Sequence, residues 1–119
     1  MTTDQVILRV VQLVERNRCS LQDEKRTQVD LAKVFADDGL NASREHRLST
    51  NDIPDFFVDG VVIEVKIKGQ RTAIYRQIER YCTHPEVKGI VLVTSKSILL
   101  PPSINGLPAR VASLSKAWL

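Results

Sequence analysis

The sequence predicts a single α/β domain, of the α+β kind, with a mixed central sheet flanked by helices. The expected elements follow the order α-α-β-β-β-α-β, with a possible closing strand. The second half holds a strand, helix and strand unit, which implies a parallel pair with a crossover helix packed on the sheet. Asp59-Gly60 stands between two apolar runs, the strongest short-range signal for an antiparallel hairpin. The 119 residues favour one domain over residues 1–119.

The first expected element is a helix over residues 3–17. Its apolar residues stand at positions 6, 7, 10, 11, 13 and 14, the spacing of a helix with a broad buried stripe. The polar residues that follow, Asn17 to Ser20, are expected to end it.

A second helix is expected to begin at Ser20, because Ser20 with Asp23 three residues later resembles a capping box. Leu31 and Phe35 recur at helical spacing within it. Gly39 is the residue type that most often follows the end of a helix, so we expect the helix to stop there.

The hairpin is expected to follow a polar edge strand. Residues 41–48 are expected to form that strand, and residues 51–54 a turn. Residues 55–58 and 61–68 are rich in β-branched and aromatic residues, which favours two strands joined by Asp59-Gly60.

The last third of the chain predicts one more helix and two strands. The helix covers residues 70–82 and stops before Pro85. A continuous apolar run over residues 88–95 favours a strand buried on both faces. Residues 101–108 are expected to form a loop, and residues 109–114 a last short strand.

Charge and apolar patterning exclude several classes of protein. The net charge is +3 and the isoelectric point about 9.1, which permits a polyanionic partner without requiring one. No apolar run approaches the roughly 20 residues of a membrane helix. The N-terminal segment contains Arg9 and lacks the basic lead of a signal peptide. Cys19 and Cys82 have no zinc-site spacing, so we expect two reduced, structural thiols in a cytoplasmic protein.

The hairpin carries its charged residues on one face. If Asp59-Gly60 is a two-residue turn, Asp55 pairs with Glu64, and their Cβ atoms lie about 4.5–5.5 Å apart on the same side. Side chains alternate along a strand, so Lys66 joins the two acids. The other face is apolar and is made by Phe56, Val58, Val61, Ile63, Val65 and Ile67.

Two opposed carboxylates destabilise a sheet because their charges repel. A raised pKa on one acid, the Lys66 ammonium or a bound cation would offset the repulsion. One negative charge remains after Lys66 is counted, and oxygen ligands at this spacing suit a hard divalent ion such as Mg²⁺. A solvent-facing strand surface is the simpler interpretation of these residues, and a slip of the register by one residue would separate the acids.

These residues resemble a known family. Pro54-Asp55, eight intervening residues and then Glu64-Val65-Lys66 are similar to the signature of the PD-(D/E)XK nuclease superfamily. The expected order over about residues 20–95 resembles its restriction-endonuclease-like core, α-β-β-β-α-β, with the first helix as an N-terminal addition. Gln77 and Tyr81 resemble the helix motif of the RecB-like branch.

The resemblance implies a metal-dependent DNA nuclease. Asp55, Glu64 and the Val65 carbonyl would bind Mg²⁺, for which Mn²⁺ substitutes. Lys66 would orient the attacking water and stabilise the transition state. Gln77 and Tyr81 would lie beside the metal site and support it.

The resemblance also implies an upstream acid, for which the chain offers two candidates. Families of this type often place a glutamate on the first core helix, where Glu24 stands. Positions 24, 28, 31 and 35 follow one helix face, and Leu31 and Phe35 direct that face to the core. A first-turn glutamate is also favoured by the helix dipole alone. Glu45, on the expected edge strand, is the rival.

Four cations around the last expected helix are candidates for phosphate contacts, although a solvated helix face explains them equally well. They are Lys68, Arg71, Arg76 and Arg80. His46 and His84 show no partner pattern, and Trp118 is expected to be a packing or dimer anchor.

The leading hypothesis is a small Mg²⁺-dependent deoxyribonuclease. It would be a structure-selective endonuclease, similar to a Holliday-junction resolvase, acting as a homodimer in phage or bacterial DNA processing. The alternative is a non-catalytic nucleic-acid-binding or assembly module on the same fold, in which the acids and Lys66 form an ion-pair network. A third hypothesis is an interaction subunit that uses the first helix and binds neither metal nor DNA.

Overall fold

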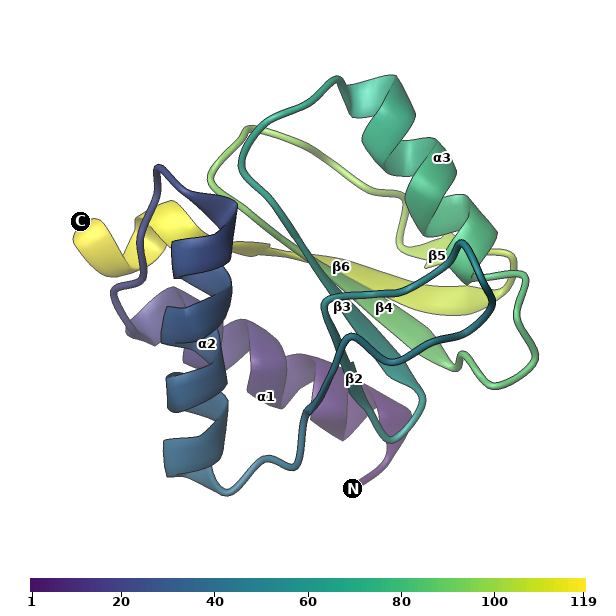
Figure 1. The fold of residues 1–119 in the computed structure, drawn as a ribbon, viewed down its shortest axis with the longest axis horizontal. Coiled ribbons are helices and arrows are strands. Elements are labelled where there is room, and N and C mark those ends of the chain that lie inside the picture. The colour runs from purple at the N-terminus through teal and green to yellow at the C-terminus, as the bar shows by residue number, and fades with distance from the viewer.

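A mixed six-stranded sheet organises the chain in the computed structural model, which describes residues 1–119 (Figure 1). The strand order is β1-β2-β3-β4-β6-β5. The strands are β1 (Ser43–Arg44), β2 (Phe56–Val58), β3 (Val61–Lys66), β4 (Gly89–Thr94), β5 (Ser103–Ile104) and β6 (Leu107–Ser113). The helices are α1 (Thr3–Arg16), α2 (Glu24–Asp38) and α3 (Arg71–Tyr81), with a short 3₁₀ helix η1 (Leu114–Trp118) at the end.

The sheet has parallel pairs at its centre and antiparallel pairs toward both edges. β2 pairs antiparallel with β3, with Phe56 opposite Ile63 and Val58 opposite Val61, which confirms the predicted register of the hairpin. β3 and β4 are parallel, and α3 is the crossover between them. β4 is also parallel to β6, so the three central strands all end at the same edge of the sheet. The predicted α+β class with a mixed sheet is therefore confirmed.

The helices cover both faces of the sheet, α1 and α2 one face and α3 the other (Figure 1). The face toward α1 and α2 carries the apolar side chains predicted for it, among them Phe56, Ile63 and Val65. The face toward α3 buries Val62, Ile90 and Leu92 against Ile74 and Ile78 of the helix. β4 is buried along its whole length, as a central strand between two layers must be.

The N-terminal helix forms as predicted. Val6, Val10 and Val14 follow one another at a spacing of four residues and are all fully buried. Thr2 and Gln5 cap its N-terminus reciprocally, each side chain bonding the backbone N–H of the other residue. None of the helices has the length and apolar character that crossing a lipid bilayer requires.

The predicted start of the second helix is wrong. The helix begins at Glu24, and Asp23 is its N-cap, accepting from the backbone N–H groups of Lys25 and Arg26. Ser20 lies in the preceding loop, where its carbonyl accepts from the Thr27 hydroxyl at 2.6 Å. The predicted end is confirmed, because Gly39 adopts φ 80° and its N–H bonds the last turn.

Two other predictions at the sheet edges need correction. The first strand covers only Ser43–Arg44 of the predicted residues 41–48, because Glu45 has φ 52° and turns the chain away. The predicted loop over residues 101–108 contains a second hairpin, in which Asn105-Gly106 joins β5 to β6. Pro108 is tolerated in β6 because its partner there, β5, is a two-residue edge strand.

Gly60 is required by the tight turn between β2 and β3. Asp59 and Gly60 have φ values of 48° and 87°, the pattern of a type I′ turn. A Cβ on Gly60 would also lie 2.9 Å from Cγ of Lys88. We expect Gly60→Ala to lower the free energy of unfolding by about 2–3 kcal/mol, combining a left-handed backbone cost with overpacking.

The second hairpin supplies a matched control for this prediction, which urea unfolding would measure. Gly106 has φ 76° in the same turn position, and a Cβ there meets no atom within 4 Å. Gly106→Ala should therefore lower the free energy of unfolding by only about 1–2 kcal/mol, the cost of the left-handed backbone. Equal losses in the two variants would mean that Lys88 moves aside freely.

Candidate active site

The structure brings Asp55 and Glu64 together where β2 begins. Asp55 stands one residue before β2, and its backbone N–H donates to Oε1 of Glu64 at 3.2 Å. In return, the backbone N–H of Val65 donates to Oδ2 of Asp55 at 2.7 Å. The type I′ turn and the observed register place these two acids beside each other, as the sequence predicts.

Burial raises the pKa of both acids, and repulsion from Asp55 adds to the shift at Glu64. The pKa of Glu64 rises to about 7, first because the side chain is buried and second because Asp55 carries a like charge nearby. Lys66 opposes this shift, with Nζ 3.5 Å from Oε2 of Glu64. The pKa of Asp55 is also raised, chiefly by burial, against the hydrogen bond from Val65. Lys66 supplies one positive charge beside these two carboxylates, so the pair is only partly neutralised when both acids are ionised.

A relay from α3 orients Glu64. The Tyr81 hydroxyl donates to Oε2 of Glu64 at 3.3 Å, and Nε2 of Gln77 donates to the Tyr81 oxygen at 2.9 Å. Burial raises the pKa of Tyr81 further, with the Glu64 charge as the next cause, so the phenol stays protonated and acts as a donor. Gln77 and Tyr81, predicted to lie beside the acids, do lie there.

Asp55 is held by a second relay, from α2. Nε2 of Gln28 donates to Oδ1 of Asp55 at 3.1 Å, and the Arg44 guanidinium donates to Oε1 of Gln28 at 3.1 Å. Sequence reasoning did not select Gln28 or Arg44 as site residues. A signal for Gln28 was present, because it lies one turn after Glu24 on the same helix face. No pattern marks Arg44, which lies in a two-residue strand.

Neither upstream acid completes a cluster of three. Glu24 accepts from the backbone N–H of Ile67 at 2.8 Å and of Lys68 at 3.3 Å, so it joins α2 to the chain just beyond β3. Its charge still contributes to the raised pKa of Asp55. Glu45 is exposed, and only its backbone N–H reaches the site, donating to the Asp55 carbonyl at 3.1 Å. No group of three or more His, Cys, Asp or Glu side chains is placed to hold a metal ion.

The two carboxylates fit a Mg²⁺ site whose remaining ligands would be water and substrate phosphate. Mg²⁺ is usually bound through one or two carboxylates, with water and substrate phosphates completing its shell. Asp55 and Glu64 supply two carboxylates, and burial is the main cause of their raised pKa values. They do not supply the cage of protein ligands that would hold an ion without a phosphate.

The candidate cations lie in different surroundings. Lys68 and Arg76 are exposed. Arg80 is engaged in a separate cluster, where its Nε lies 3.2 Å from Oδ1 of Asp52. His84, to which the sequence assigned no role, holds the other oxygen of Asp52 at 2.8 Å, and this contact is the main cause of the lowered pKa of Asp52. Arg71 lines a cavity beside α3.

Two aromatic contacts account for residues left open by the sequence. His46 stacks on Phe57 with ring centroids 4.3 Å apart, so it packs against β2. Trp118 donates from Nε1 to the carbonyl of Cys19 at 3.1 Å, with the Arg18 guanidinium over its ring. Trp118 therefore makes packing contacts within its own chain.

Comparison with known proteins adds no relative. A scan against protein-family models finds no match, and searches of the curated proteins and of the solved structures find none either. The resemblance to the PD-(D/E)XK superfamily thus depends on the motif residues and on the geometry around them.

The pKa of Glu64 leads to a prediction for stability. An acid with a pKa raised in the folded state stabilises the fold below its unfolded value of 4.5, and this contribution is lost as the pH rises through about 7. We expect the free energy of unfolding of Glu64→Gln, measured in urea, to exceed that of wild type at pH 8 by on the order of 2 kcal/mol. Near pH 4 the two proteins should have the same free energy of unfolding. A variant that is less stable than wild type at pH 8 would contradict the raised pKa of Glu64.

Proposed function

We propose that this protein is a metal-dependent nuclease that hydrolyses phosphodiester bonds in DNA. The observation that carries the proposal is the pair of acids, the half-buried Asp55 and the buried Glu64, held side by side with Lys66 at the end of a central strand. Groups of this kind stabilise the charge that grows on a phosphate during hydrolysis.

Each residue of the group has a separate task. Asp55, Glu64 and the carbonyl of Val65 would hold Mg²⁺, or Mn²⁺ as a substitute. When bound, the ion supplies a water of lowered pKa and neutralises charge on the phosphate. Lys66 is partly exposed, so its ammonium can contact both the attacking water and a phosphate oxygen. Gln77 and Tyr81 keep Glu64 in place, and Gln28 does the same for Asp55.

The fold supports the same proposal. The observed order α2, β1, β2, β3, α3, β4 has the succession of the restriction-endonuclease-like core, and α1 precedes it. β5, β6 and η1 follow it. We therefore assign the chain to the PD-(D/E)XK superfamily, near its RecB-like branch, as part of the proposal.

The proposed substrate is a DNA structure rather than a sequence, since one small domain leaves little surface for reading bases. A homodimer would place two sites for cleavage of two strands, as a junction resolvase requires. Phage or bacterial DNA processing is the setting we propose for it.

A cleavage assay tests the proposal. The protein would be incubated with junction, flap, duplex and single-stranded DNA, in Mg²⁺ and in chelator, together with an RNA strand. We expect Mg²⁺-dependent cutting of at least one DNA structure. Metal binding without any cutting would overturn the nuclease assignment.

One observation favours the alternative, a non-catalytic nucleic-acid-binding or assembly module. Both oxygens of Asp55 and both oxygens of Glu64 already accept from protein donors. Because no third acid is placed to share a metal ion with them, the group is also consistent with an ion-pair network. In that case Asp55→Asn and Lys66→Ala would leave DNA binding intact, and the wild type would show no hydrolysis.

A further inference from the structure

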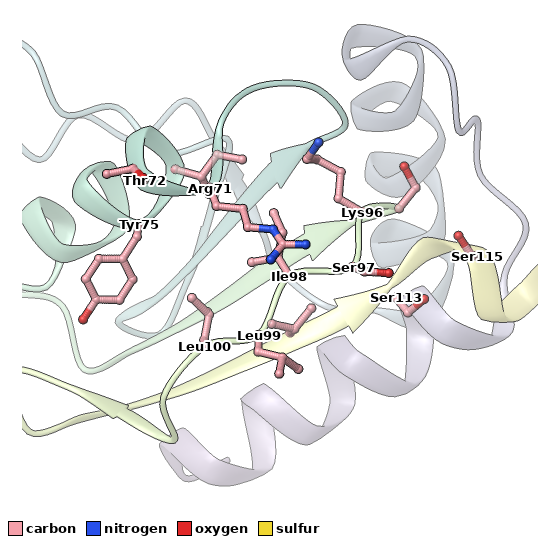
Figure 2. Close-up of a pocket in the computed structure, with 13 residues that line it drawn as sticks. Arg71, Thr72, Tyr75, Lys96, Ser97, Ile98, Leu99, Leu100, Ser113 and Ser115 are labelled. Carbon is pink, nitrogen blue, oxygen red and sulfur yellow. The ribbon is translucent and has the colours of Figure 1, made fainter.

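A cavity of about 960 Å³ lies beside the candidate active site (Figure 2). It is bounded by the start of α3, by the segment after β4 and by the end of β6. Its lining combines apolar side chains, among them Ile74 and Ile98, with serine hydroxyls and two cations. A cavity of this size and mixed lining is typical of sites for small organic groups.

The sheet register places this cavity on the same face as the acids. Glu64 of β3 stands beside Leu92 of β4, and Leu92 beside Val111 of β6. One step further along, Lys66, Thr94 and Ser113 form a parallel row. Val111 and Ser113 line the cavity and therefore share a face with Glu64 and Lys66. Neighbouring strands lie about 4.8 Å apart, so the cavity begins within about 10 Å of Lys66.

The charge in the cavity is positive and uncompensated. Arg71 and Lys96 line it, and no Asp or Glu does. Neither cation takes part in any salt bridge of the chain, whereas Arg9, Arg26, Lys33 and Arg80 all do. Figure 2 shows the Arg71 guanidinium extending over Ile98, between Tyr75 on one side and Ser113 and Ser115 on the other.

We propose that this cavity binds one unpaired nucleotide of a DNA strand that passes over Lys66. Arg71 and Lys96 would bind its phosphate. The base would lie against Ile98 and the Tyr75 ring, since base stacking on an aromatic ring beside backbone-tracking cations is how single strands are bound. The inference rests on the proposed function and deepens it: a substrate must present an unstacked nucleotide, as junctions and flaps do and uniform duplex does not.

Photochemical cross-linking tests the position of the base. The full chain would be mixed, in chelator so that nothing is cut, with oligothymidylate carrying one 5-iododeoxyuridine. We expect the cross-linked peptide to contain Tyr75 or the segment 95–100. Cross-links confined to other surfaces would overturn the proposal.

Binding measured by fluorescence anisotropy tests the contacts, with the same oligothymidylate and chelator. The double variant R71A/K96A should bind about tenfold more weakly than wild type. The slope of log affinity against log salt should become less steep by about 1.4, because two phosphates of a single strand lose their cationic partners. The double variant R16A/K33A removes the same amount of charge from α1 and α2, away from the cavity. It should change the affinity and the salt slope less than R71A/K96A does. Tyr75→Ala should weaken binding about tenfold and Tyr75→Phe should not.

The outcomes separate this inference from the nuclease proposal. Cutting of DNA with unchanged affinity in R71A/K96A would overturn the cavity and leave the nuclease. Loss of affinity in R71A/K96A, with cross-links at the cavity but no cutting by wild type, would support the cavity and overturn the nuclease. Thymidine 5′-monophosphate binding as tightly as the oligonucleotide would overturn the assignment to a strand.

Discussion

Asp55→Asn should lower the rate of Mg²⁺-dependent DNA cleavage by about a thousandfold or more. Asn keeps the shape and can still accept from the backbone N–H of Val65, but it removes one of two charges that would hold the ion. Metal stabilisation of the transition state is worth several kcal/mol, and about 1.4 kcal/mol is a factor of ten in rate. The measurement is single-turnover cleavage of whichever DNA structure the wild type cuts.

Asp59→Asn is the matched control for this prediction. The same chemical change then lies in the same hairpin, at an exposed turn position with φ 48°, which Asn tolerates well. It should cleave at the wild-type rate. Calorimetric titration in the presence of a phosphorothioate DNA that resists cleavage should detect Mg²⁺ binding to Asp59→Asn and much weaker binding to Asp55→Asn. Equal cleavage by the two variants would remove Asp55 from the chemistry.

Lys66→Met should slow cleavage by about a hundredfold to a thousandfold while leaving DNA affinity within a few-fold of wild type. Met conserves the length of the side chain and removes the ammonium that lies 3.5 Å from Glu64. Removal of one preorganised group that stabilises transition-state charge costs rates of this order. Affinity depends on many phosphate contacts, so it changes little.

Lys68→Met provides the comparison, since Lys68 is exposed two residues further along the chain. It should lose only a phosphate contact, with a small change in affinity and none in the rate at saturating DNA. A Lys66 variant that loses affinity and rate in the same proportion would indicate that Lys66 serves binding alone.

The core of the fold was predictable because local signals agree with it. Asp59-Gly60 sets a turn, the turn sets the register, and the register decides which side chains share a face. The prediction that Asp55 meets Glu64 follows from this chain of causes. The buried strand β4 could also be predicted, because no polar residue interrupts its apolar run.

Sequence-based prediction failed where two local signals competed and where tertiary contacts leave no local pattern. The capping signal of Ser20 lost to that of Asp23, whose side chain reaches two backbone N–H groups of the helix. Pro101, Pro102 and Pro108 favoured a loop, although Asn105-Gly106 between them is a hairpin signal of the same strength as Asp59-Gly60. The relay from Arg44 through Gln28 to Asp55 joins three distant segments and left no local pattern.

At the proposed Mg²⁺ site, the pKa of Glu64, raised to about 7, would make protons and divalent cations competitors for the same carboxylate. A cation that binds there would have to displace the proton of any molecule in which Glu64 is protonated. Affinity for the cation should therefore weaken as the solution becomes more acidic, and its uptake in a weakly buffered solution should release acid. The burial that orders these side chains would thus make occupancy of the proposed metal site depend on the pH of the solution.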